Sequence, residues 1–345
     1  MDISSYNSSL LGIPCEDLEK FNADWKTEIK DFEVEEIPLY EPSGEGNHLY
    51  LFIEKENLNT SDVCMMLKKV FKVSENFIGY AGLKDKHGRT RQWFSVANST
   101  WDETIAQQLS EVKVLKHSYH DNKLRLSHLR GNKFKIVLRG EIEQDQNKLD
   151  KIKNRILEKG IPNFFGTQRF GYQGKNIDTG YSLFKEDHLQ KKIRSKRKRS
   201  LFVSTLQSLL FNEYLNRRLK LGDIESPILG ERWTIGGSKT FILNDKKDLE
   251  SDVAVPSGPM FGSKFLKAEG EALDLENKIL SDYELNEEDL SRNGKLSLGT
   301  RRALWIKIDK LEAYFEEDTV VLEFSLPSGS YALNVVSCFC DKKKA

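Results

Sequence analysis

Strand-like segments follow one another closely up to residue 140 of this 345-residue chain, with few helices between them. Alternation of apolar and polar residues predicts strands over 31–40, 48–55, 77–81, 124–126 and 133–139. Helical spacing predicts helices over 63–71, 104–112 and 145–159. A doubly wound parallel sheet needs a helix between successive strands, so this order favours a mixed α+β fold instead.

The pattern changes after Pro162. A long helix is predicted over 200–219, because Leu206, Leu209, Leu210 and Phe211 gather on one side. A glycine- and acid-rich region follows, and residues 319–336 return to strand-like alternation. These features predict a second domain inserted into a discontinuous first one.

The charge is balanced but unevenly distributed. Lys and Arg number 53, as do Asp and Glu, so the formal net charge is zero. This balance neither requires nor excludes an RNA partner. The run KKIRSKRKR, residues 191–199, is strongly basic. Such a run taken alone is more often a solvated loop or helix face than a binding site.

The cysteines and the N-terminus predict an ordinary intracellular protein. Cys338 and Cys340 form a C-x-C pair without a second pair of metal ligands, and Cys15 and Cys64 stand apart. We therefore expect reduced thiols, with neither a metal site nor a disulfide framework. No basic leader and no run of roughly 20 apolar residues is present, so a cytoplasmic location without membrane contact is expected.

The window 79–94, GYAGLKDKHGRTRQWF, carries the most chemical information. A predicted strand leads into a loop with Asp85 surrounded by Lys84, Lys86, Arg89 and Arg91. Positive neighbours favour the ionised carboxylate and attract phosphate groups. From the residues alone, the loop is either a carboxylate held inside an RNA-compatible basic rim or a surface loop with ordinary ion pairs.

The pattern G-x-K-D-K-x-x-x-T-x-Q resembles the signature of TruD pseudouridine synthases. Further segments resemble that family in the expected order, namely DFEVEE, SGEGNH, LRGNKFKIVLRG, PNFFGTQRFG, RSLFVSTLQSLLFN and LPSGSYALNVV. The resemblance implies a catalytic domain with a mixed, largely antiparallel sheet, formed by residues 1–158 and 304–345. It also implies an inserted α/β TRUD domain at 159–303, with folded RNA held by the two domains.

The resemblance implies a tRNA pseudouridine synthase that isomerises a uridine, at position 13 of the D-arm, with Asp85 as the catalytic carboxylate. The carboxylate can attack C1′ as a nucleophile or remove the C2′ proton to give a glycal. Both routes stay open. The reaction needs no outside redox or energy source, so no cofactor is expected.

Five further residues match active-site positions of the family. Asn132 is expected to orient Asp85, and Phe134 to stack on a uracil flipped out of the RNA. Phe32 and Tyr331 match aromatic positions, and Lys84 is a candidate partner for Asp85. For Phe32 and Phe134, plain core packing is the alternative.

The predicted partner is tRNA, bound by a monomer because one chain already carries both domains. Arg169 can reach phosphate or make a structural contact, and the structural role is slightly preferred. Phosphate contacts of the basic run would position the tRNA without reading its sequence. The complete set of candidate RNA-binding residues is Lys86, Arg89, Arg169, Lys191, Lys192, Arg194, Lys196, Arg197, Lys198 and Arg199.

Two other classes of function fit the sequence less well. A non-catalytic RNA-binding or RNA-folding protein would not require the set of Asp85, Asn132 and Phe134. Nucleases commonly gather carboxylates around metal ions and glycosidases use a carboxylate pair, whereas the window 79–94 contains one Asp and no acidic partner. Gly88 and Arg89 stand where small apolar residues are frequent in the family, which predicts a local change in loop packing.

Overall fold

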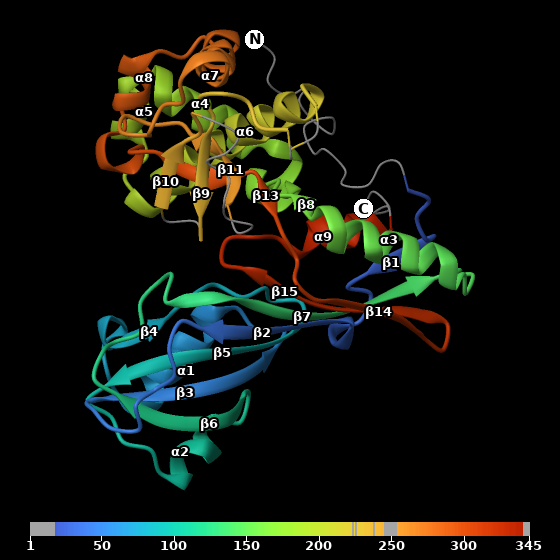
Figure 1. The fold of residues 1–345 in the computed structure, drawn as a ribbon. Helices are drawn as coiled ribbons and strands as arrows, with labels where there is room; N and C mark the ends of the chain where they lie inside the picture. Colours follow the sequence, from blue (N-terminus) through green and yellow to red (C-terminus); the bar gives the residue numbers. More distant parts are fainter. Residues whose placement is uncertain (1–17, 223, 225, 237–238, 245–253, 341–345) are drawn as a thin grey trace. The chain divides into compact units, whose positions relative to one another are not determined.

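The computed structural model describes residues 18–340 apart from 223, 225, 237–238 and 245–253. These residues form two compact units (Figure 1). The first unit comprises residues 18–159, 308–332 and 336–340, and the second comprises residues 160–307 and 333–335. Among the described residues, no helix has both the length and the apolar character to cross a membrane.

A nine-stranded sheet forms the centre of the first unit, with strand order β14-β15-β7-β2-β5-β3-β6 (Figure 1). β1 pairs with β7, and β4 with β5. β2 and β5 are parallel to each other, and the other strand pairs of this sheet are antiparallel. The predicted mixed, largely antiparallel α+β sheet is thus confirmed. The strands are β1 (Ala23–Trp25), β2 (Phe32–Pro38), β3 (His48–Glu56), β4 (Ile78–Tyr80), β5 (Arg89–Ala97), β6 (Lys113–His120), β7 (Leu129–Gly140), β14 (Leu311–Glu316) and β15 (Thr319–Pro327).

Helix α1 (Thr60–Phe71) covers one face of this sheet. It buries Val63 and Leu67 against Leu51, Ile53 and other apolar residues of the sheet. The helix starts where the sequence predicts, because Asn59 and Asp62 form a capping box. Helix α3 (Gln146–Lys159) packs against β14.

Two local predictions in this unit are wrong, and one helix is shorter than predicted. Residues 124–126 are not a strand, and residues 332–336 are helical. The helix predicted over 104–112 forms as α2 (Glu103–Gln108) but ends earlier, and the edge strand β6 that follows was not predicted. Strand β15 ends at Pro327, and a turn through Gly329, with φ +84°, leads into helix α9 (Ala332–Phe339). The β-branched residues after the turn suggested a strand, but burial on one helix face outweighs this weak local preference.

The second unit is built around helix α6 (Lys196–Lys220), most of whose central residues are buried. α6 packs on α4 (Asn176–Lys185) and on strand β11 of a four-stranded sheet with order β10-β9-β11-β12 (Figure 1). β8 and β13 form a separate pair. The other elements of this unit are β8 (Ile161–Pro162), α5 (Asp187–Lys192), β9 (Arg232–Ile235), β10 (Lys239–Ile242), β11 (Ala254–Met260), α7 (Gly270–Asp282), α8 (Glu287–Ser291), β12 (Thr300–Ala303) and β13 (Trp305–Ile306), with the 3-10 turns η4 (Thr167–Phe170), η5 (Tyr172–Gly174) and η7 (Gly294–Leu296). The 3-10 turns η2 (Ile29–Asp31) and η3 (Glu75–Phe77) belong to the first unit.

Candidate active site

Asp85 lies in the loop between β4 and β5, on the sheet face that α1 covers. Cross-strand pairing places Val34, Thr90 and Lys55 on one face, because directly opposite residues share a side of the sheet. The Nζ atom of Lys55 donates a hydrogen bond of 2.8 Å to the backbone oxygen of Asp85. The loop therefore rests on this face.

The signature residues around Asp85 hold the loop in place. The backbone N–H of Lys84 donates to Oγ1 of Thr60 over 3.0 Å, and this hydroxyl donates to Oε1 of Gln92 over 3.0 Å. The side-chain amide of Gln92 then donates to the backbone oxygen of Gly82 over 2.9 Å. Gly82 and Gln92 therefore help to fix the loop.

Lys84 forms a buried ion pair with Glu36, not with Asp85. Its Nζ lies 3.2 Å from Oε2 of Glu36, and both side chains are almost completely excluded from solvent. Burial raises the pKa of Glu36 and lowers the pKa of Lys84, while the attraction between the two groups opposes both shifts. The pairing predicted for Lys84 is wrong because its buried ammonium needs a buried carboxylate.

The carboxylate of Asp85 pairs with Lys26, a residue that sequence reasoning missed. Their Nζ–Oδ2 distance is 2.6 Å, and the side chains are 19% and 46% exposed for Lys26 and Asp85. The same ammonium lies 3.8 Å from the centre of the Phe32 ring and 4.8 Å from that of Trp25. Lys26 stands 59 positions before Asp85 in a segment without regular periodicity, so no local pattern signals the contact.

Two of the three aromatic residues predicted for the site, Phe32 and Phe134, are packed together. The Phe32 and Phe134 ring centres are 6.2 Å apart, and Phe134 stacks on Phe324 at 5.3 Å. Both Phe32 and Phe134 are buried. Their contacts are therefore those of core packing. The cluster is nevertheless connected to Asp85, because the Lys26 ammonium that pairs with Asp85 also lies over the Phe32 ring.

Asn132 lies on the same sheet face, opposite Glu36 on β2 and Leu326 on β15. Its Oδ1 atom is buried and accepts no hydrogen bond from the described residues. A buried polar atom without a partner is unusual in a native protein. The side-chain oxygen of Asn132 can therefore accept a hydrogen bond from a bound molecule, and it forms no hydrogen bond with Asp85.

Arg89 and Arg91 lie on the opposite face of the sheet from Asp85, which corrects the expected basic rim. Both pair with Glu33 across the parallel β2–β5 contact, and Arg89 also contacts Glu56 at 2.6 Å. These acids, absent from the window 79–94, neutralise the arginines. Side chains alternate between faces along a strand, so neighbours in the sequence are separated here.

Gly88 closes the loop against Phe32. Its φ of +144° is a conformation that other residues rarely adopt, and a Cβ atom there would lie 2.6 Å from the Phe32 backbone oxygen. The absence of a side chain at this position is thus explained by the close packing of the loop.

Comparison with known proteins identifies the family. The model of the family described as tRNA pseudouridine synthase D (TruD) matches residues 13–191 and 189–338. A tRNA pseudouridine synthase D from Thermus thermophilus is 36% identical over 331 residues, covering 93% of this chain and 89% of that protein. The chain belongs to the TruD family. A second relative with the same name, from an Anaeromyxobacter species, is 37% identical over 315 residues, covering 89% of each chain.

The fold also agrees with a solved TruD structure. A Methanosarcina mazei protein given this family name superposes with a TM-score of 0.75 at 24% identity, covering 98% of both chains. At this identity the likeness speaks for the fold alone.

In this TruD-family chain, the other predicted residues of the first unit have separate positions. Lys86 follows Asp85 and is exposed. Tyr331 directly precedes α9 and is half-buried. Their roles stay predictions.

Arg169 makes structural contacts in the second unit of this TruD protein. Its Nε donates to Oγ of Ser208 on α6 over 3.2 Å, and its guanidinium lies 5.7 Å from the Phe165 ring centre. Its backbone oxygen accepts from Thr205 over 3.3 Å. These contacts favour the structural role.

The basic run spans the end of α5 and the first turn of α6. Lys191, Lys192, Arg194, Lys196, Arg197 and Lys198 are exposed, and none forms an ion pair with another described residue. Arg199 is half-buried. The first turn of α6 contains no acidic residue. Cations at a helix N-terminus oppose the helix dipole, whereas an anion bound there is favoured.

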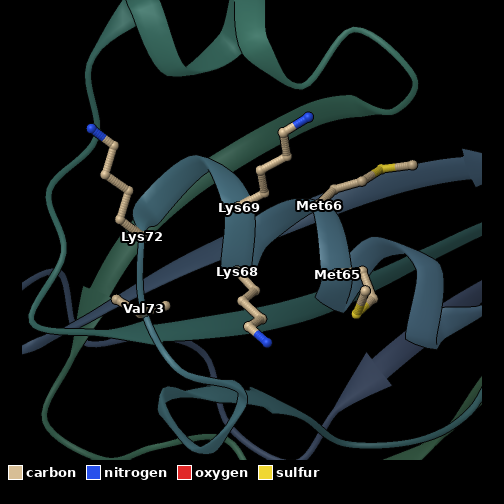
Figure 2. Close-up of a pocket in the computed structure, with 6 residues that line it drawn as sticks. All are labelled: Met65, Met66, Lys68, Lys69, Lys72 and Val73. Carbon is tan, nitrogen blue, oxygen red and sulfur yellow. The ribbon is translucent and has the colours of Figure 1, made fainter.

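A hollow of about 610 Å³ lies on α1 and the residues that directly follow it (Figure 2). Its lysines lie near the C-terminal end of the helix, where positive charge suits the helix dipole. None of the predicted site residues lines it. The lining residues are Met65, Met66, Lys68, Lys69, Lys72 and Val73.

Within the described part of the chain, no group of three or more His, Cys, Asp or Glu side chains could hold a metal ion. Cys64, Cys338 and Cys340 are buried and form no disulfide among the described residues. Cys15 lies outside the described residues.

Proposed function

We propose that this TruD-family chain is a tRNA pseudouridine synthase in which Asp85 is the catalytic carboxylate. Its kinship with tRNA pseudouridine synthases D supports isomerisation of uridine in tRNA. The observation that carries the assignment of Asp85 is a half-exposed carboxylate 2.6 Å from a lysine ammonium, on a loop fixed from several sides. Such a group is accessible to a substrate and held in a defined position.

The chemistry follows from the carboxylate. The bond between C1′ and N1 breaks, the uracil turns, and C5 joins C1′; the proton on C5 is lost and N1 gains one. Asp85 acts as a nucleophile at C1′ or as a base at C2′. Lys26 holds the Asp85 carboxylate in position, and the free Oδ1 of Asn132 would accept a hydrogen bond from a uracil N–H. Phe32, Phe134 and Tyr331 would supply the aromatic surface.

We also propose how the tRNA is held. Lys86 and the run from Lys191 to Arg199 would contact phosphates, because the exposed cations of that run lack acidic partners among the described residues. Arg89 and Arg169 are proposed as structural residues, given their contacts with Glu56 and Ser208. The target would be position 13 of the D-arm.

The domain boundaries belong to this proposal. Residues 1–158 and 304–345 would form the catalytic domain, and residues 159–303 the inserted TRUD domain. The division of the described residues supports a discontinuous first domain with an insertion, although residues 304–307 and 333–335 group with the second unit. The enzyme would act as a cytoplasmic monomer without a cofactor.

Release of tritium tests the reaction directly. A tRNA transcript labelled with tritium at C5 of uridine loses label to water only when C5 gives up its hydrogen. Wild-type protein should release one tritium per tRNA, and Asp85→Asn none. Tight tRNA binding without release from any cellular tRNA would favour the non-catalytic RNA-binding alternative.

A further inference from the structure

Lys55 is a buried cation that the proposed chemistry does not use. It lies on β3, is 1% exposed, and points to the sheet face that carries the Asp85 loop. Its Nζ donates to the backbone oxygens of Leu58 at 2.7 Å and Asp85 at 2.8 Å. It forms no ion pair with a carboxylate of the described residues. A buried ammonium held only by carbonyl groups costs folding stability.

We propose that Lys55 is a positioning residue, whose ammonium fixes the backbone of Asp85 so that the carboxylate points at the substrate. The inference rests on the proposed function. Lys55 ties three segments together, namely strand β3, the turn before α1 and the catalytic loop. Unlike Lys26, it reaches Asp85 through the backbone and would not touch the substrate.

The contact stands at the point of the loop where position matters most. Thr60 and Gln92 hold Lys84 and Gly82, which precede Asp85. Lys55 holds Asp85 itself from the sheet side, while Lys26 holds the carboxylate at its other end. Misplacement of a reacting group by about 1 Å can cost roughly a hundredfold in rate.

The surroundings of Lys55 make this contact sensitive to pH. Burial lowers the pKa of Lys55 to about 8, although the carboxylates of Asp85 and Asp62 raise it; the ammonium of Lys84 lowers it. Deprotonation weakens the hydrogen bonds to the carbonyl groups, because a neutral amine is a poorer donor than an ammonium. The rate should therefore fall as pH rises through about 8.

Stability should change in the opposite direction. The pKa of Lys55 is about 8 in the folded protein and 10.5 as a model value for the unfolded chain. Between these values the unfolded chain binds more protons than the folded protein, so this group makes stability rise with pH. A purely structural lysine would not combine rising stability with falling rate.

The test compares wild type, Lys55→Met and Lys55→Arg with the control Lys310→Met, whose side chain is 81% exposed. Tritium release under single-turnover conditions, tRNA Kd and Tm are measured from pH 6.5 to 9.5. Lys55→Met should lose roughly tenfold or more in rate at pH 7, with Kd within about twofold and little change of rate with pH. The control should match wild type.

Arginine stays charged throughout this pH range. Lys55→Arg should therefore keep more of the rate than Lys55→Met, without the decline above pH 8. The Tm of wild type should rise relative to that of Lys55→Met between pH 8 and 9.5.

A folded Lys55→Met protein with the wild-type rate would overturn the inference, while the proposed function would stand. A wild type without tritium release would instead contradict the proposed function itself. If Lys55→Met does not fold, the dependence of the rate on pH is compared between wild type and Lys55→Arg. A decline above pH 8 in wild type alone supports the inference, and equal dependence from pH 7 to 9.5 contradicts it.

Discussion

The ammonium of Lys26 lies 2.6 Å from the Asp85 carboxylate and 3.8 Å from the centre of the Phe32 ring. A single cation thus joins the proposed catalytic group to an aromatic residue of the early strand. The ion pair fixes the position of the Asp85 carboxylate, and contact with the ring fixes the lysine head.

Lys26→Met should lower the single-turnover rate about 10- to 100-fold, because a charge-assisted hydrogen bond contributes about 1.5–3 kcal/mol. Tritium release measures the rate. Lys30→Met is the matched control, since Lys30 is exposed and pairs with Glu28. Equal rates for Lys26→Met and wild type would contradict a role of Lys26 in the reaction.

Glu36→Gln should destabilise the protein by about 3–5 kcal/mol, because it leaves Lys84 buried without a carboxylate. Urea denaturation gives the free energy of unfolding. Glu323→Gln, which disturbs a longer, partly exposed pair with Lys135 and an exposed hydrogen bond from the Tyr314 hydroxyl, should stay within about 0.5 kcal/mol of wild type. A similarly small effect at Glu36 would contradict the importance of the buried pair.

Gly88→Ala should impair both stability and rate. The new Cβ atom would meet the Phe32 backbone oxygen at 2.6 Å, in addition to the strain of φ +144°. We expect a loss of about 1–3 kcal/mol and displacement of the Asp85 loop. Gly44→Ala is the control, because Gly44 has φ +95° but no atom within 4 Å of the added Cβ. It should keep the wild-type rate, and an equal loss at both glycines would argue against loop packing as the cause.

Lys196→Gln and Lys198→Gln together should weaken tRNA binding without lowering the rate at saturating enzyme. Loss of two phosphate contacts should reduce the slope of log Kd against log salt by about 2. Lys220→Gln, at the other end of α6, should leave the slope unchanged. Salt titrations of tRNA binding supply the slopes, and identical slopes for all variants would exclude phosphate contact at the basic run.

The sequence predicted the sheet class and the loop that presents Asp85, because strand alternation and the local signature are short-range patterns. It did not predict which residue pairs with Asp85. Lys26 and Glu36 lie far from the loop in the sequence and contact it only in the folded protein. Because side chains alternate along β5, Arg89 lies on the face of the sheet opposite Asp85. The sequence did not predict helix α9. Buried valines such as Val335 and Val336 are typical of strands but also occur on the buried side of a helix, so the local pattern does not distinguish the two.

The most direct test of Asp85 as the catalytic carboxylate is a map of pseudouridine in an unmodified tRNA transcript after incubation with wild type or Asp85→Asn. Chemical labelling followed by primer extension locates each modified position. If Asp85 is the catalytic carboxylate, one new signal should appear, at position 13 of the D-arm, with wild type only, while the variant still binds the tRNA. A signal of equal strength from Asp85→Asn would contradict this role of Asp85.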